Sequence, residues 1–444
     1  MQIPAIRHWQ KNPPLVLAVG FLFMIAVGTL LLMHPVSSAA GVGTTFMDAF
    51  FTATSATCVT GLAVVNTAVY WSVFGQAVIL VLIQIGGLGF MTMTVLIAML
   101  LHKKITLSDR LVIKEQFGQE SLTGMVRWMR YIMLATLGVE MLGAVFLSTQ
   151  WIPLYGWKTG LWYSVFHAVS AFCNAGFDLF GDSLLPFQAN SVVQLTIAAL
   201  IIAGGLGFSV HMDLFRRNRK RWQLHTKLVL SMTMLLLAGG TLLFFLIESK
   251  NPATWATLPV WERWQAAFFQ SVTTRTAGFY SVSQSNLTEI SLVLSIFLMF
   301  IGGSPAGTAG GIKTTTFAVL LLSTRAQIQG ASHIEVFKRS IHSDVVMRAL
   351  TMIMIALVWV ISISFILAVK ENIPYLQSIY ETVSAFATVG LTMDLTPRLS
   401  TLSKVLLAIT MYAGRVGPVT LAYALIQRKK KADYRSAEGN VMVG

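Results

Sequence analysis

Four copies of one short segment constrain this chain more than any other feature. Each copy opens with an aromatic residue, carries glycine at its eleventh place and closes with leucine or phenylalanine. Because the copies align without a gap and recur at near-equal intervals, we expect four related units around one shared axis. The copies are Phe51–Leu62, Phe166–Phe177, Phe268–Phe279 and Tyr380–Leu391.

The composition is that of a membrane protein. Hydrophobic residues make up 55% of the 444 residues and charged residues only 11%, whereas soluble domains carry about 25% charged residues. The mean hydropathy is +0.69. A membrane-spanning helix takes about 20 residues, so up to about ten spans would fit. The two cysteines are too few for a disulfide framework or a metal site. No arrangement of a nucleophile and a base indicates an enzyme. No nucleotide-binding motif indicates a cofactor in this chain.

Apolar runs flank each copy and predict two spans per unit. The run of about 12 residues between them is too short to cross and fits a re-entrant half-helix. The predicted fold class is an all-α membrane protein of four tandem helix, re-entrant helix, helix units around one pore, with eight transmembrane helices. Leading spans are expected near 14–33, 131–147, 228–247 and 349–369, and trailing spans near 73–100, 192–210, 290–322 and 402–426.

The unit boundaries follow from these spans. The units are predicted at 1–100, 101–216 with a linking segment, 217–325 and 326–428, with a basic tail at 429–444. Two half-helices are expected to start at capping boxes, one from Thr45 to Asp48 and one from Ser378 to Glu381. Most of the 32 lysines and arginines fall at the termini and between the units. The positive-inside rule therefore places both termini and the linking segments in the cytoplasm, and it explains the net charge of +14 better than nucleic-acid binding does.

Glycine loops around an axis in a membrane are typical of an ion path. A filter replaces the water shell of an ion with carbonyl oxygens, and glycine adopts the unusual dihedrals that this needs. Half-helices would aim their partly negative ends at the centre and favour a cation. The candidate selectivity-filter residues are Val59, Thr60, Gly61, Asn174, Ala175, Gly176, Thr276, Ala277, Gly278, Thr388, Val389 and Gly390.

Acidic residues near the outer ends of the spans are expected to concentrate cations at the mouth. They lie in the outer loops or at the half-helix starts. They are Asp48, Asp178, Asp182, Glu248, Glu262, Glu289, Glu371, Glu381 and Asp394.

The trailing span of the third unit contains a run of small residues around Pro305, which cannot form a continuous helix. Irregular backbone at membrane depth is tolerated where it is buried or lines a wet cavity, so residues 302–311 are predicted to form a gating loop below the filter. Close helix packing is the alternative, and it is preferred for the glycines at 86, 87 and 89 and at 204, 205 and 207. The candidate gate residues are Gly302, Gly303, Ser304, Ala306, Gly307, Thr308, Gly310, Gly311, Lys313 and Arg415.

Arg415 lies in the middle of the last apolar span. An intramembrane charge is costly and needs a partner, and carbonyls freed by the loop are natural acceptors. On the axis it would raise the barrier to a cation, and the alternative is an arginine bonded between helices. Lys313 is expected either to snorkel or to bond the loop, and Arg275 is expected to brace the filter from behind and not to line it. Glu140 has no evident partner in the sequence.

With these motifs in view, the chain resembles the Trk/Ktr/HKT superfamily of potassium transporters, most closely the membrane subunit of bacterial Ktr systems. The resemblance covers essentially the whole chain. It implies one filter glycine per repeat at Gly61, Gly176, Gly278 and Gly390, and an intramembrane gating loop. Gly61 implies potassium, because some sodium-preferring plant relatives have serine there.

The resemblance also implies a setting and partners. They are a bacterial plasma membrane, uptake driven by the membrane potential, a homodimer, and a cytosolic ring of nucleotide-binding regulatory subunits of the RCK/KTN type. Whether sodium is required stays open. The alternative function is a secondary transporter of another monovalent cation or small solute. Inverted repeats and paired broken helices would favour that alternative, whereas four parallel copies, each with a re-entrant half-helix, favour a channel-like path.

Overall fold

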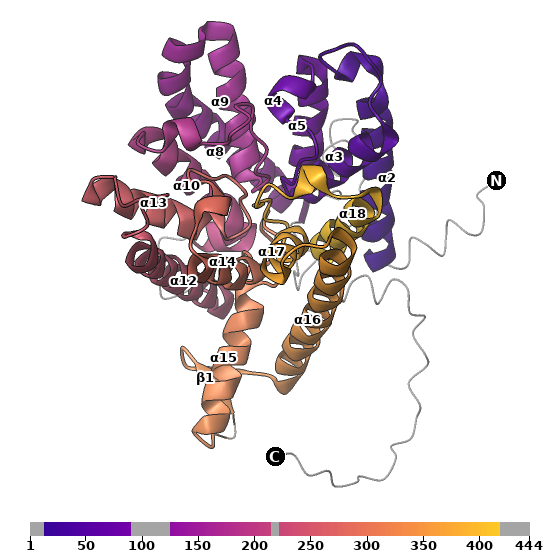
Figure 1. Ribbon diagram of the computed structural model, residues 1–444. Coiled ribbons are helices and arrows are strands. Elements are labelled where there is room, and N and C mark those ends of the chain that lie inside the picture. Colours follow the sequence, from indigo (N-terminus) through magenta and orange to yellow (C-terminus); the bar gives the residue numbers. More distant parts are fainter. Residues whose placement is uncertain (1–12, 90–124, 215–221, 332, 418–444) are drawn as a thin grey trace, which may run out of the picture.

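The computed structural model describes residues 13–89, 125–214, 222–331 and 333–417. Around each glycine segment the chain forms a long leading helix, a shorter middle helix, a loop and a trailing helix. Figure 1 shows the four sets as successive colours arranged around a common centre. The leading helices are α2 (Pro13–Met33), α8 (Met125–Tyr155), α12 (Leu224–Glu248) and α16 (Ser343–Glu371).

The middle helices run toward the centre and stop short of the glycines. They are α3 (Phe46–Cys58), α9 (Trp157–Phe172), α13 (Val260–Thr273) and α17 (Tyr375–Phe386). At 12 to 16 residues they are shorter than a membrane span. The trailing helices are α5 (Val73–Leu88), α10 (Ser191–Leu206), α14 (Glu289–Phe300) and α18 (Thr401–Val416).

Three trailing spans are interrupted at a glycine, so the prediction of continuous helices at 73–100, 192–210 and 402–426 was wrong in this respect. α10 ends at a glycine with φ +89°, and α11 (Phe208–Leu214) follows at an angle of 100°. α5 and α18 end in the same way at Gly89 and Gly417, with φ of +86° and +93°. The remainder of those two predicted spans, at 90–100 and 418–426, lies outside the described residues.

Apolar length agrees with a membrane protein. Among the described residues, four helices are long and apolar enough to cross a membrane, or five if α10 and α11 count as one span. They include all four leading helices, and α5 and α14 are shorter apolar helices. The fold is therefore a mostly helical membrane protein with several apolar spans.

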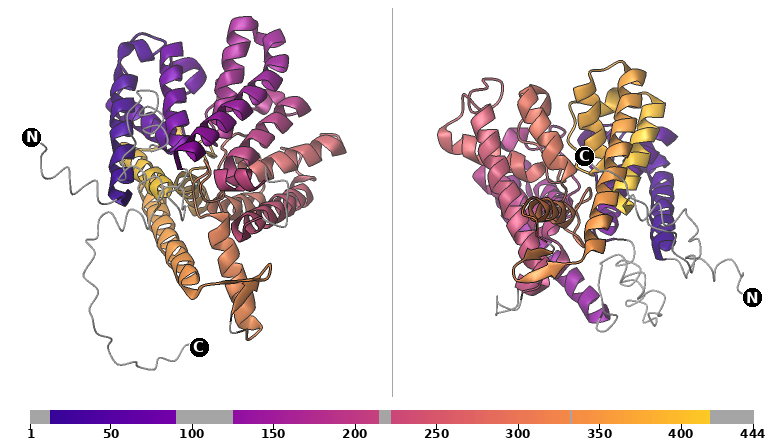
Figure 2. Two further views of the ribbon diagram at one scale, coloured as in Figure 1. Left: turned by 180° about the vertical axis from the view of Figure 1, so that it is seen from behind. Right: turned by 90° about the horizontal axis from the view of Figure 1, so that it is seen from below.

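Below the centre, α15 (Thr314–Ile328) and the start of α16 project to one side (Figures 1 and 2). A small antiparallel hairpin of β1 (Ile334–Val336) and β2 (Arg339–Ile341) lies between them in sequence, with Ile334 opposite Ile341. Short helical turns at α4 (Thr67–Tyr70), η1 (Pro35–Ser37), η2 (Leu185–Phe187), η4 (Gln284–Asn286) and η5 (Thr396–Arg398) complete the opposite side.

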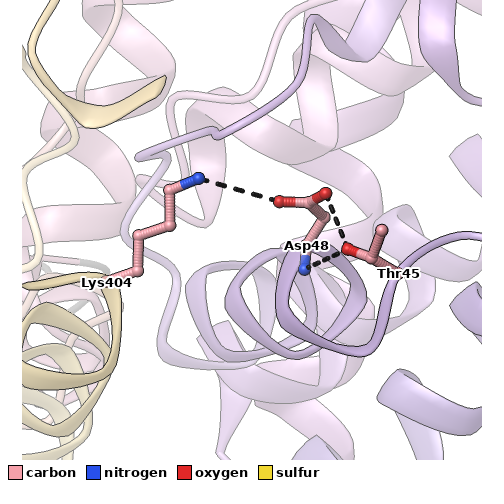
Figure 3. A network of polar contacts seen from close by, with 3 residues as sticks. All are labelled: Thr45, Asp48 and Lys404. Carbon is pink, nitrogen blue, oxygen red and sulfur yellow. Dashed lines mark hydrogen bonds and ion pairs between the residues drawn. The ribbon is translucent and has the colours of Figure 1, made fainter. Parts of the chain in front are cut away.

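Of the two predicted capping boxes, the N-cap bond of the first is confirmed. The Thr45 hydroxyl accepts from the Asp48 N–H at 3.2 Å and donates to the Asp48 carboxylate at 2.7 Å, and α3 begins directly after Thr45 (Figure 3). The second prediction was wrong. α17 begins after Pro374, and the Ser378 hydroxyl instead donates to the Ser364 carbonyl in α16 at 2.6 Å.

Candidate functional site

The glycine loops, residues 59–61, 174–176, 276–278 and 388–390, share one backbone conformation. Their glycines have φ of +93°, +68°, +81° and +92° in chain order. The residue two places before each glycine is also left-handed, although none of these is glycine: Val59, Asn174, Thr276 and Thr388 have φ between +52° and +68°. Such dihedrals strain an L-residue, and four equivalent outliers indicate a shared functional geometry.

The four glycines form a closed ring. A Cβ added to Gly61 would lie within 3.0 Å of the Ala175 carbonyl oxygen, next to Gly176. A Cβ on Gly176 would meet the Ala277 carbonyl, one on Gly278 the Val389 carbonyl, and one on Gly390 the Thr60 carbonyl. Each loop thus faces the next in order and the fourth faces the first. At this approach only glycine fits.

Hydroxyl groups of the middle helices secure the loops. The Gly61 N–H donates to Ser55 Oγ and the Gly390 N–H to Ser384 Oγ, each at 3.1 Å. Ser170 donates to the Phe177 carbonyl at 2.8 Å, and Thr273 donates to the Phe279 carbonyl. Sequence reasoning missed these residues. The signal was available, because Ser55, Ser170 and Ser384 share the fifth place of the repeated segment.

The predicted gate region is an irregular loop between α14 and α15, and it packs directly beneath the glycine loops. The Ser304 N–H donates to the Gly205 carbonyl at 2.9 Å, and Thr308 Oγ1 donates to the Phe172 carbonyl at 3.1 Å. A Cβ on Gly310 would collide with Thr388 Oγ1. The loop is therefore fixed against the end of α9, the end of α10 and the fourth glycine loop.

Arg415 joins three elements at this point. Its guanidinium donates to the Thr308 carbonyl of the loop and to the Gly86 and Gly87 carbonyls at the end of α5. Lys313 Nζ donates to the Ala309 carbonyl at 2.7 Å. Arg275 was expected behind the filter, but its guanidinium donates to the Gly302 carbonyl at 3.3 Å, at the start of the loop. Three cationic side chains thus each donate to a backbone oxygen of one loop, and Arg275 Nε is buried without a hydrogen-bond partner.

Small residues in the trailing helices permit this close assembly. Three glycines of the trailing helices lie against carbonyl groups at the ends of the middle helices, so that an added Cβ would collide. The pairs are Gly86 with Thr57, Gly204 with Phe172, and Gly414 with Phe386. The preference for close packing is therefore confirmed at Gly86 and Gly204, whereas Gly89 and Gly207, which were included in it, end α5 and α10 with positive φ. The helix breaks three residues further on were not foreseen.

Several carboxylates expected at the mouth are engaged in structural bonds instead. Glu248 accepts from the Thr288 N–H and hydroxyl at the start of α14, and Glu371 accepts from Ser400 and Ser403 at the start of α18. Glu381 is fully buried behind the fourth glycine loop. Each carboxylate thus closes a helix start or a loop, and the expectation that these three attract cations at the mouth stays a prediction.

Asp178, just after the second glycine loop, is also held locally. Its carboxylate accepts from the N–H groups of Phe180 and Gly181 at 2.9 and 2.7 Å. Burial raises the pKa of this carboxyl above its ordinary value, and these backbone N–H groups act in the opposite direction.

Glu140 has a partner that the sequence did not indicate. Gln84 Nε2 in α5 donates to its carboxylate at 3.3 Å, and Cys173 Sγ lies 3.6 Å from Gln84 Oε1. Both cysteines are buried and free. Within the described residues, no group of three histidine, cysteine, aspartate or glutamate side chains could hold a metal ion.

Comparison with known proteins identifies the family of this chain. Residues 19–434 match the TrkH family, described as cation transport protein. The chain is 44% identical to the potassium/sodium uptake protein NtpJ of Enterococcus hirae, over 98% of this chain and 97% of that protein. It is 43% identical to the Ktr system potassium uptake protein B of Bacillus subtilis, over the full length of both.

A solved structure supports the fold. The potassium transporter TrkH from Vibrio parahaemolyticus superposes with a TM-score of 0.73 at 18% identity, covering 92% of this chain and 85% of that one. At this identity the likeness concerns the architecture alone.

Proposed function

Because this chain belongs to the TrkH family of cation transport proteins, we propose that it takes up potassium through a filter formed by the four glycine loops. The observation that carries the proposal is the closed ring, in which each glycine faces the carbonyl before the next. A ring of carbonyl oxygens can replace the water shell of a monovalent cation. The family is one of ion transporters and not of enzymes.

The proposed architecture has eight crossings around this ring. The four helix sets correspond to units at 1–100, 101–216, 217–325 and 326–428, with the tail at 429–444. The basic termini and linking segments face the cytoplasm of a bacterium, and the glycine loops open outward. The membrane potential then drives cations inward through the ring.

Sodium enters the proposal as a second ion to be measured. The name of the E. hirae relative includes both potassium and sodium. Gly61 places no side chain in the ring, and the same holds for the glycines of the other three loops. Because the four loops are then equivalent, the ring favours potassium, the larger ion, which can contact all four.

The gate is proposed at the loop from Gly302 to Gly311 together with Lys313 and Arg415. The loop lies against the glycine loops and on the path that an ion would take below them. The Arg415 guanidinium places a full positive charge beside Thr308, and a cation passing nearby is repelled by it. Because Arg415 is bonded to the loop, movement of the loop would displace both the loop backbone and the guanidinium from the ion path.

The assembly is proposed to be a homodimer on a cytosolic ring of nucleotide-binding subunits. The name of the B. subtilis relative places it in a Ktr system. Each chain already closes its own ring, so the dimer would hold two independent paths. A tandem dimer with one Gly278→Asp half should keep about half the flux. A silent tandem dimer would contradict this arrangement.

The decisive experiment is rubidium and sodium uptake into vesicles that contain the purified protein. Gly278→Asp should reduce uptake by at least about a hundredfold, because its side chain would enter the ring beside the Val389 carbonyl. Gly61→Ser should weaken discrimination against sodium. Gly239→Ala is a matched control, since a Cβ there meets no atom within 4 Å. Wild-type uptake and selectivity in both ring variants would refute the proposed filter.

A further inference from the structure

The second place of the repeated segment differs in all four copies. It holds Thr52, His167, Phe269 and Glu381, each buried in a middle helix. A filter made of four equal quarters would need no such variety. The residues in the second and fourth copies, on opposite sides of the glycine ring, reach the chain that follows their own glycine loop.

His167 holds the second loop in one orientation. Its Nδ1 lies 2.7 Å from the Tyr163 carbonyl, which can only accept, so Nδ1 carries the proton. Its Nε2 then accepts from the Leu179 N–H at 3.3 Å, three residues after Gly176. The ring stacks on Phe180 with centroids 4.5 Å apart and meets Trp151 edge to face at 4.9 Å. The imidazole is fully buried, so it has little freedom to turn.

Glu381 holds the chain after the fourth glycine loop, and it does so with a carboxylate that accepts hydrogen bonds from hydroxyl groups. Thr392 Oγ1, two residues after Gly390, donates to its carboxylate, at 2.9 Å from Oε2. Thr396 Oγ1 donates to the other oxygen. Thr392 in turn accepts from the Leu395 N–H at 3.2 Å, so the carboxylate organises a whole turn of chain. Its solvent exposure is zero, and it therefore depends on these bonds.

We propose that His167 and Glu381 are positioning residues that hold the second and fourth glycine loops, and that discrimination of potassium from sodium depends on them. This rests on the proposed filter. In the cavity-size account of selectivity, a carbonyl ring prefers the larger ion because its loops resist closing around the smaller one. A buried acceptor that pins the chain two or three residues beyond the glycine supplies such resistance.

The other two copies provide matched controls. Phe269 shows that a phenyl ring fits the second place of the segment, so His167→Phe removes the acceptor and keeps an aromatic ring. Thr52 Oγ1 is buried and has no hydrogen-bond partner, so Thr52→Val removes a hydroxyl without breaking a bond. Gln can place an oxygen near the position of His Nε2 or of a Glu oxygen, so His167→Gln and Glu381→Gln retain an acceptor.

The experiment measures the ratio of rubidium to sodium uptake in vesicles for each variant. A ratio is independent of how much protein folds, because both ions pass through the same molecules. His167→Phe and Glu381→Met should each lower the ratio about tenfold, as expected for loss of one buried hydrogen-bonded anchor. His167→Gln, Glu381→Gln and Thr52→Val should stay within about twofold of wild type.

The outcomes separate this inference from the proposed function. A wild-type protein that carries no rubidium overturns the proposed function and this inference with it. A wild type that discriminates, with unchanged ratios in His167→Phe and Glu381→Met, overturns the inference alone. Equal loss in Thr52→Val and His167→Phe would also overturn it, because the effect would then follow burial and not the acceptor.

Discussion

The trailing helices of the second and third units break at similar depth but in different ways. α10 turns through Gly207 alone and continues as α11 at 100°. Between α14 and α15 the chain instead runs from Ile301 to Lys313 without regular structure. A single glycine bends one helix into two, whereas the run of small residues around Pro305 forms an irregular loop that packs beneath the glycine loops.

The longer break is as well secured as the short one. Its ends are paired, since the Gly302 N–H donates to the Ile312 carbonyl at 2.8 Å, and the Phe208 N–H just after the α10 bend donates to the Ala306 carbonyl at 3.0 Å. The two breaks therefore support each other. The difference lies in chemistry: the loop offers free carbonyls, and Arg275, Lys313 and Arg415 donate to them.

The largest expected effect comes from filling the space where the two breaks meet. In Gly204→Val the new side chain would collide with the Phe172 carbonyl and with Thr308 Oγ1. Backbone cannot move aside cheaply, so we expect destabilisation of about 3 kcal/mol or more and little folded protein. Thermal unfolding of the purified protein measures this. Gly239→Val in α12, where a Cβ meets no atom within 4 Å, is the control. A similar loss of stability in both variants would show that the close packing at Gly204 is not the cause.

The next effect concerns the loop itself. Removal of residues 303–310 should raise initial rubidium flux several-fold, because the paired ends at Ile301 and Ile312 can still be joined while the obstacle is gone. Arg415→Ala should raise flux up to about tenfold, since it removes a cationic barrier on the order of 1 kcal/mol. Flux is compared with and without the proposed cytosolic regulatory subunit. Unaltered flux in both variants would leave the loop a structural element only.

The smallest effect is expected at the periphery, far from either break. Lys404 in α18 and Asp48 in α3 form an ion pair at 3.8 Å that ties the fourth unit to the first (Figure 3). Partly exposed pairs contribute about 0.2–1 kcal/mol. Lys404→Ala should therefore lower the unfolding midpoint by less than about 2 °C and leave flux unchanged. A large shift would show that contacts between units matter more than the central packing.

The sequence by itself determined the elements that depend on local chemistry. Apolar length fixed the leading helices, and four aligned glycines marked the ring. Pro305 among glycines excluded a helix at 302–311, because proline lacks a donor and glycine loses much entropy in a helix. The aligned hydroxyls at Ser55, Ser170 and Ser384 could have been read in the same way.

Only the tertiary structure decided which distant groups meet. The left-handed backbone of Val59, Asn174, Thr276 and Thr388 is held by packing, since local preference opposes it for these residues. The partners of Arg415 lie on α5 and the loop, more than a hundred residues away in sequence. Glu381 changed from an expected mouth carboxylate to a buried anchor, because Thr392 and Thr396 fold back over it. The sequence shows which charged groups in an apolar chain need hydrogen-bond partners, and the tertiary structure determines which residues those partners are.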